Sequence, residues 1–159
     1  MEFPEGNLNL YLTEIGEPSD NRLRIVVGEG LLGASERIKA AGVDLGEGRP
    51  IVLTGESRFF ELNWDDYVAY AVRNESFWAA EPEEPPFVKH LSRRFNSAFL
   101  QFVSTTTFAD DDYPGPLQHW ALATLNHCVD VVSVQPPRVV AINIPAVAGV
   151  AVATNYEKG

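Results

Sequence analysis

The residues of this chain that could support chemistry lie in two short stretches. The first, the sequence YAVRNES, ends a predicted strand with four consecutive polar side chains. The second places a histidine and an aspartate inside an otherwise apolar C-terminal region. A buried histidine or aspartate needs partners, because an unpaired buried charge is costly. We therefore expect Arg73 to pair with Asp130, and Glu75 to hold a ring N–H of His119 or His127.

This polar set has two interpretations. As a structural network it would fix the register of the strands, since buried polar groups that satisfy one another also serve folding alone. As a functional site it would form the floor of a ligand pocket, which aromatic side chains and the phenylalanines of a helix would line. His119 would then act as a general base oriented by Glu75, in a hydrolase or isomerase that acts on a small molecule. The candidate pocket residues are Tyr70, Arg73, Asn74, Glu75, His119, Trp120 and Asp130.

Three short motifs at these positions resemble the pattern of an uncharacterised bacterial protein family. They are Tyr70-x-Val72-x-Asn74-Glu75-Ser76, Ser97-x-Phe99-Leu100, and His119-Trp120 followed by Asp130-Val131-Val132. The resemblance covers roughly residues 57 to 138. Because no activity is known for that family, the resemblance implies no role for any residue. It supports the treatment of the polar set as one unit.

A glycine motif occupies residues 28–33 (GEGLLG), a literal G-x-G-x-x-G after a predicted strand. In dinucleotide-binding folds these glycines permit a tight turn and let a pyrophosphate approach the N-terminus of a helix. Here the following helix would be only about two turns long, Glu29 would lie beside the diphosphate, and no series of βα units follows. A glycine-rich reversal between two strands is therefore favoured, and no cofactor is expected.

Metal-binding and nucleophile motifs are also weak, because neither C-x-x-C, H-E-x-x-H nor G-x-S-x-G occurs. His119 and His127 would lie about 27 Å apart on one straight strand at ~3.4 Å per residue, so only a sharp reversal near residues 122–126 would bring them together. The adjacent aspartates at residues 110–112 are more typical of a solvated loop. Cys128 is expected to be a buried core thiol. We expect no metal site and assign no catalytic residue.

The elements that must position these residues are mostly strands, because apolar residues alternate with a period of two along much of the chain. The Asp65-Asp66 pair would turn one strand into the next of a meander. The predicted strands are residues 8–12, 23–27, 51–54, 58–64, 67–73, 117–134 (one long bent strand or two) and 139–142.

An apolar stripe at helical spacing predicts one amphipathic helix over residues 88–102, with prolines before it and the run 104–107 at its end. Its phenylalanines are expected in the core. Residues 35–41, which precede Gly42, predict a shorter helix. The fold class is therefore α+β: an antiparallel sheet of about six strands with one main amphipathic helix packed on it.

Residues 1–159 are expected to form one globular domain, in which the tail 143–159 is an edge strand or a dimer arm. The tail is apolar and β-prone, so it would be an aggregation hazard unless it docked on its own sheet or on a second copy. Residues 95–159 hold only seven of the 34 charged side chains. That distribution indicates either central strands or an apolar association surface.

The net charge of −10 excludes classes of partner. Nucleic acids and anionic membrane surfaces are expected to be repelled. The acidic N-terminus is unlike a signal peptide, and one cysteine suits a reducing compartment, so a bacterial cytoplasmic protein is expected. The favoured function is an acidic binding or protein-interaction domain with a basic protein or a small molecule as partner. The alternative is the small-molecule enzyme described above.

Overall fold

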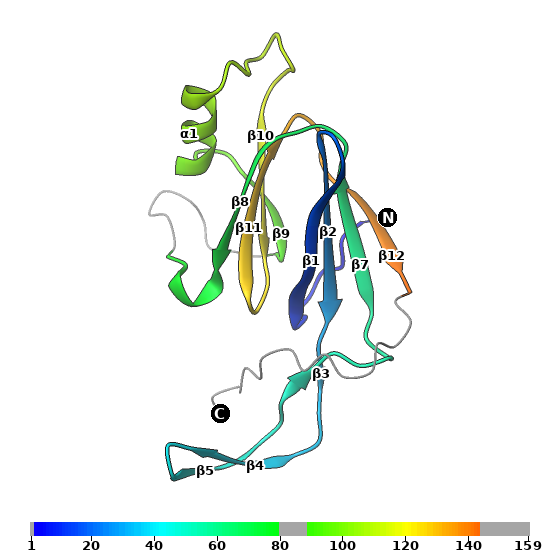
Figure 1. Cartoon of the computed structure of the whole chain (residues 1–159), viewed down its shortest axis with the longest axis vertical. Helices are drawn as coiled ribbons and strands as arrows, with labels where there is room; N and C mark the ends of the chain where they lie inside the picture. Colours follow the sequence, from blue (N-terminus) through cyan, green and yellow to red (C-terminus); the bar gives the residue numbers. More distant parts are fainter. Residues whose placement is uncertain (1, 80–88, 144–159) are drawn as a thin grey trace.

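The computed structural model describes residues 2–79 and 89–143, in which two four-stranded antiparallel sheets form the main body (Figure 1). From edge to edge the first sheet contains β1 (Leu10–Ser19), β2 (Arg22–Glu29), β7 (Phe59–Trp64) and β12 (Arg138–Ile142). The second sheet contains β8 (Tyr67–Asn74), β11 (His127–Ser133), β10 (Gln118–Ala123) and β9 (Leu91–Arg94).

The hydrophobic core lies between the two sheets. Alternate residues of β2 and β7 point inward from the first sheet, and alternate residues of β10 and β11 point inward from the second. Trp64 is the largest fully buried side chain of this core. The buried members are Leu23, Ile25, Val27, Phe60, Leu62, Trp64, Leu122, Val129, Val131 and Val139.

The prediction of antiparallel sheet with one helix is confirmed, whereas the single sheet of about six strands is wrong. The connection through Asp65 and Asp66 carries the chain from β7 in the first sheet to β8 in the second, so no β7–β8 hairpin forms. The strands predicted at residues 51–54 and 58–64, which a Gly-Glu turn separates and which would suit a hairpin, do not pair with each other, because β6 (Ile51–Val52) pairs with β3 (Leu31–Leu32) and β7 pairs with β2. A period of two identifies the buried face of a strand but not its neighbour, and both sheets face one core.

Helix α1 (Ala98–Thr106) is shorter than predicted. The first part of the expected helix forms β9 instead, and residues 80–88 lie outside the described part of the chain. Of the α1 side chains only Val103 is buried, so the predicted core position of the phenylalanine stripe is wrong. No helix in the described ranges is long and apolar enough to cross a membrane.

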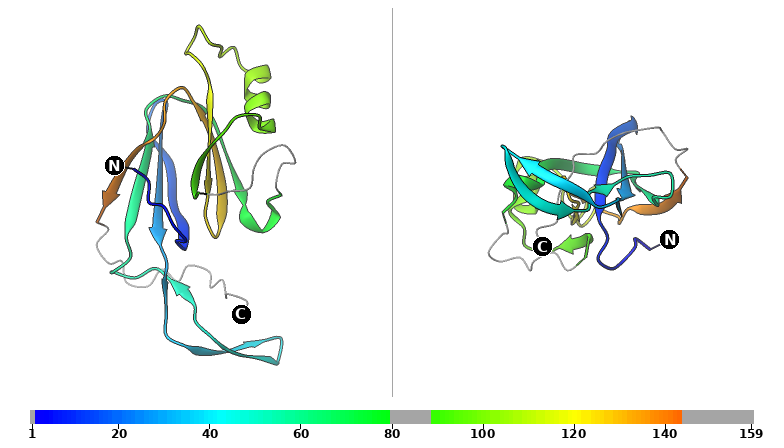
Figure 2. Two further views of the ribbon diagram at one scale, coloured as in Figure 1. Left: turned by 180° about the vertical axis from the view of Figure 1, so that it is seen from behind. Right: turned by 90° about the horizontal axis from the view of Figure 1, so that it is seen from below.

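The predicted helix over residues 35–41 is a β-hairpin. Strand β4 (Glu36–Ala40) pairs with β5 (Val43–Gly48), and the pair points away from both sheets (Figure 2). Ala41 and Gly42 have φ values of 49° and 80°, the left-handed conformation that a tight two-residue hairpin turn needs. Residues 35–41 have a composition compatible with a helix, but the turn at Ala41 and Gly42 favours the hairpin.

Residues 117–134 were expected to form one long bent strand or two strands, and the structure has two. Antiparallel pairing of β10 with β11 places Trp120 opposite Val131 and makes both strands central in the second sheet. His119 is opposite Val132, far from the turn, while His127 lies beside the turn. The reversal therefore leaves these histidines at opposite ends of the hairpin. Of the predicted tail 143–159, residues 144–159 lie outside the described residues.

Candidate functional site

A row of polar side chains crosses the outer face of the second sheet. Arg73, Asp130 and His119 come from the neighbouring strands β8, β11 and β10. In the antiparallel register Cys128 is opposite Arg73 and Ala121 is opposite Asp130, so all three polar residues point to the face away from the core. Helix α1 lies on that same side (Figure 1). The sheet thus brings together three of the seven predicted site residues.

The row is joined by hydrogen bonds into one chain. Arg73 Nη2 donates to Asp130 Oδ2 at 2.7 Å, and His119 Nε2 lies 3.0 Å from Asp130 Oδ1. On the other side of the imidazole, His119 Nδ1 lies 2.6 Å from Ser97 Oγ. With Asp130 ionised, Nε2 carries the imidazole proton and Nδ1 accepts from the serine hydroxyl. We call Arg73, Asp130, His119 and Ser97 the polar relay.

The N-terminus of α1 continues the polar relay. Ser97 is the N-cap of the helix, and its Oγ accepts a hydrogen bond from the Leu100 N–H at 3.1 Å. The edge of the Phe99 ring faces the His119 ring at a centroid distance of 5.6 Å. One serine hydroxyl therefore fixes the helix start and satisfies a buried imidazole at the same time.

The charges of the polar relay are balanced although Asp130, His119 and Ser97 are buried and only Arg73 reaches solvent. Burial by itself would raise the pKa of Asp130, but the hydrogen bond from His119 and the charge of Arg73 outweigh it, so this pKa lies below its ordinary value. Burial raises the pKa of the neighbouring Cys128 thiol. Asp130 is thus a paired carboxylate at neutral pH, and Cys128 is a protonated thiol.

Serine, imidazole and carboxylate in sequence are the components of a hydrolase triad. The relay differs from a working triad because Ser97 is only 1% exposed and His119 only 2% exposed. The Ser97 hydroxyl is already engaged as a helix cap, because it accepts the hydrogen bond from the Leu100 N–H. A nucleophile must reach the substrate, so this geometry stabilises the fold and attaches α1 to the sheet.

The remaining predicted site residues lie elsewhere. Trp120 faces the core side of the sheet, and Tyr70 donates to Glu17 on β1 at 3.3 Å. Asn74 caps the short 3-10 helix η1 (Glu75–Phe77) by accepting from the Ser76 N–H at 2.9 Å. The predicted pocket floor is therefore divided between two faces of one sheet.

The expected role of Glu75 is wrong for His119, because Ser97 and Asp130 occupy both ring nitrogens of that histidine. His127 Nδ1 is buried without a hydrogen-bond partner among the described residues. Glu75 is exposed at the start of η1. Sequence analysis named Ser97 only within a motif and did not assign it to the polar set; the available indication was a serine directly before an Ala-Phe-Leu helical start.

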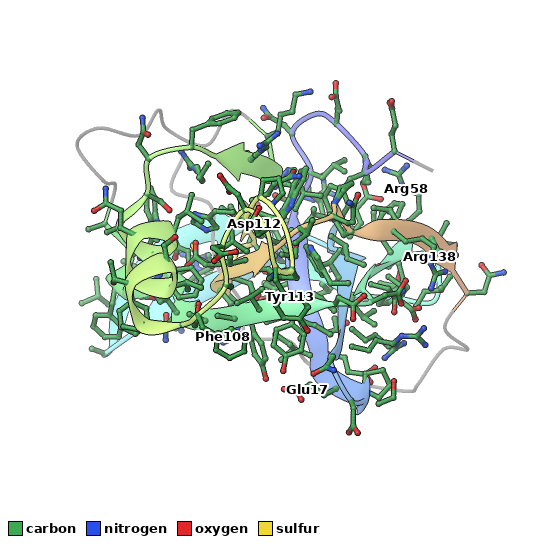
Figure 3. The ribbon with its side chains drawn as sticks, turned by 90° about the horizontal axis from the view of Figure 1, so that it is seen from above. Glu17, Arg58, Phe108, Asp112, Tyr113 and Arg138 are labelled. Carbon is green, nitrogen blue, oxygen red and sulfur yellow. The ribbon has the colours of Figure 1, made fainter. Side chains whose placement is uncertain are left out.

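A second candidate site is fully exposed. The loop after α1 carries Asp110, Asp111 and Asp112, which lie in the sequence between Phe108 and Tyr113. The two rings stack at a centroid distance of 6.4 Å and an interplanar angle of 8°, and they are 86% and 68% exposed. Figure 3 shows Phe108, Tyr113 and Asp112 together at this end of the molecule. We call these five residues the acidic–aromatic surface.

The backbone of this loop is held by its own aspartate. Asp110 Oδ1 accepts from the backbone N–H groups of Asp112 and Tyr113 at 2.9 and 2.8 Å, and the Tyr113 carbonyl accepts from the Asp110 N–H at 2.8 Å. Such bonds fix the loop shape while the aspartate charges remain in solvent. An open groove of about 530 Å³ adjoins the loop, with an apolar side formed by Leu100 and Leu117.

The glycine motif serves packing. β3 lies within it and β4 follows it, so the helix that a dinucleotide site requires is replaced by strands. A Cβ on Gly28 would lie 2.6 Å from the Phe59 ring, and a Cβ on Gly30 would lie 2.5 Å from Ile51 Cγ2. Across residues 2–79 and 89–143, no three histidine, cysteine or carboxylate side chains are grouped to hold a metal ion.

Comparison of the chain with protein-family models, with curated proteins and with solved structures gives no match.

Proposed function

We propose that the chain is a protein-interaction domain that binds a basic protein through the acidic–aromatic surface. The observation that carries this proposal is the exposed Phe108–Tyr113 stack directly beside three exposed aspartates. Aromatic faces attract lysine and arginine side chains, and the aspartates add charge-assisted hydrogen bonds to the same cations. Large exposed aromatic groups with a polar rim mark interaction sites.

Charges on neighbouring loops support the same partner. The β1–β2 turn carries Asp20 and the β7–β8 connection carries Asp65 and Asp66, all exposed. Both connections lie at the end of the molecule to which the acidic–aromatic surface belongs (Figure 1). Arg22 neutralises part of this charge through its ion pair with Asp65. The remaining acidic field would speed the encounter with a basic protein.

The alternative, a small-molecule enzyme that uses His119, has weaker support. It requires Arg73, Glu75 and His119 to converge on an open pocket. His119 is instead enclosed between Asp130, Ser97 and Phe99. We therefore assign the polar relay to stability and the exposed surface to function.

Selection of peptides on the purified domain tests the proposal. A library of random twelve-residue peptides should yield binders enriched in lysine and arginine, whose affinity falls as salt is raised. The variant Phe108→Ser/Tyr113→Ser should lose at least about tenfold in affinity, a change worth about 1.4 kcal/mol. Its matched control is Phe77→Ser, because Phe77 is equally exposed but lies on η1.

The charge contribution has its own pair of variants. Asp110→Asn/Asp111→Asn/Asp112→Asn removes three charges and leaves the Asp110 side-chain oxygen that the loop needs. The control Glu2→Gln/Glu56→Gln/Glu75→Gln removes the same charge from exposed positions elsewhere. If both variants lost the same affinity, net charge alone would explain the binding, and the proposal of a defined binding surface would be contradicted.

A further inference from the structure

The β4–β5 hairpin forms an arm that leaves the body of the molecule. β3 and β6 form its stem, where the Gly33 N–H donates to the Pro50 carbonyl at 2.7 Å. Beyond the stem, β4 and β5 pair with each other and extend past both sheets (Figures 1 and 2). Arg37 Nε donates to Asp44 Oδ2 at 2.7 Å and ties the two strands together. We call residues 31–52 the arm.

The arm exposes aliphatic side chains at its far end. Val43 and Leu45 are 58% and 60% exposed, and Leu32 on the stem is 46% exposed. In the described part of the chain β4 and β5 have extensive contacts only with each other. A two-stranded hairpin is marginally stable in water by itself, so such an arm gains stability from a surface that covers it.

The charge of the arm indicates which kind of partner covers it. The arm has three acidic and three basic side chains, so its net charge is zero and the whole net charge of −10 belongs to the rest of the chain. A basic protein would find no excess of acid here, and a nucleic acid would find no excess of base. A second copy of this chain would meet no net charge at the arm, whereas two copies that met through the rest of the chain would bring its negative excess together. The charged arm side chains are Glu36, Arg37, Lys39, Asp44, Glu47 and Arg49.

We infer that the arm is a self-association element through which two copies pack arm against arm, with Val43 and Leu45 in the contact. A two-fold contact is self-complementary, so the same side chains of both copies meet near the axis. The acidic–aromatic surface lies at the opposite end of the molecule (Figure 1). The dimer therefore holds the two acidic ends apart and leaves both of them free.

The inference is independent of the proposed function, since it uses other residues. It also differs from a dimer built on the apolar tail, because all of its contacts lie within residues 31–52. A segment of the same chain folded over the arm would give a monomer whose arm is protected. That result would overturn the inference.

Sedimentation equilibrium at about 100 µM, a concentration at which weak dimers are populated, is the first measurement. Wild-type protein should have the mass of a dimer, and Val43→Asp/Leu45→Asp should weaken association at least about tenfold. The control Phe77→Asp places a charge at another exposed apolar position and should remain dimeric. Circular dichroism melting establishes that each variant is folded. A monomeric wild-type protein, or a folded double variant with unchanged association, overturns the inference.

Disulfide cross-linking locates the contact. Cys128, the sole cysteine of the chain, is buried, so wild-type protein should give no cross-linked dimer under mild oxidation. Single substitutions Val43→Cys and Leu45→Cys should cross-link rapidly at one or both positions, and Phe77→Cys should cross-link only at the slow rate of random collision. Equal rates at all three positions overturn the arm-to-arm contact.

Discussion

Ser97 Oγ lies 2.6 Å from His119 Nδ1, so the residue that starts helix α1 also completes the hydrogen bonding of a buried imidazole. The two residues are 22 positions apart and belong to different elements. The opposite ring nitrogen, Nε2, contacts the Asp130 carboxylate. The hydrogen bond that holds the helix start is therefore coupled, through the imidazole, to the charge of Asp130.

Replacing Ser97 with alanine should destabilise the protein by about 2–4 kcal/mol. The variant loses the helix cap, worth about 1 kcal/mol, and leaves the His119 Nδ1 acceptor buried without a partner, at a cost of about 1–3 kcal/mol. Urea unfolding monitored by tryptophan fluorescence measures the change. Ser104→Ala is the control, since Ser104 is exposed on the same helix and should change stability by less than ~0.5 kcal/mol. Similar values for both variants would contradict the coupling.

The stability contribution of Asp130 should depend on pH in a defined direction. Its pKa lies below the ordinary value of 3.8 in the folded protein, so the unfolded chain binds the proton more tightly. The contribution is therefore fully present above pH 3.8 and is lost as the pH falls through the folded-state pKa.

Asp130→Asn tests this dependence. The variant should be less stable than wild type by about 2–3 kcal/mol at pH 7, because it breaks hydrogen bonds to a buried charge. The difference should shrink as the pH falls below 3.8 and through the folded-state pKa, where wild-type Asp130 itself becomes protonated. Asp66→Asn, at an exposed position, should show almost no difference at either pH. A stability difference that stays constant with pH would contradict the assignment of Asp130 as the titrating group.

Cys128 should be unreactive in the folded protein. Burial both shields its thiol and raises its pKa, and the thiolate is the reactive species. Modification by an aromatic disulfide reagent at pH 8 should follow the rate of unfolding and become rapid in urea. Phe77→Cys supplies an exposed thiol in the same chain for comparison. Fast labelling of native wild-type protein would show that the outer face of the second sheet is open at this position.

Gly30→Ala should destabilise the protein although alanine is small. Its Cβ would lie 2.5 Å from Ile51 Cγ2 and 2.9 Å from Tyr11 Cε2, which forces buried side chains to move at a cost of about 1–3 kcal/mol. Gly16→Ala is the matched control, because nothing lies within 4 Å of its added Cβ. Thermal melting compares the two. Equal melting temperatures would mean that the site around Gly30 tolerates overpacking.

Sequence reasoning was most successful for the pairing of Arg73 with Asp130, which are 57 residues apart, because an unpaired buried charge is costly. Alternation predicted strand over residues 117–134 but left open whether it forms one long strand or two, and the structure has the β10–β11 hairpin. The sheet assignment failed because Asp65-Asp66 is compatible with a hairpin turn and with a connection between sheets. Only the partners of β7 and β8, which are remote in sequence, decide between the two.

The candidate site was predicted in part for a related reason. Strand alternation places Tyr70 and Arg73 on opposite faces of β8, which follows from their odd spacing. The partner that completes the relay, Ser97, comes from a helix whose predicted start was several residues too early. An apolar stripe does not distinguish the strand residues 91–94 from a first helical turn, whereas the serine cap marks the true boundary.

The position of β7 has a consequence for synthesis of the chain. β7 pairs with β2 on one side and with β12 on the other, and the entire second sheet is translated between β7 and β12. On the ribosome, β1, β2 and β7 can pair early, but one edge of β7 stays without hydrogen-bond partners until residues 138–142 emerge. A chain that ends before Arg138 would keep that edge open permanently, next to the apolar face that carries Phe60, Leu62 and Trp64. β12, an edge strand in the finished fold, is thus the segment whose arrival removes the main site for aggregation during folding.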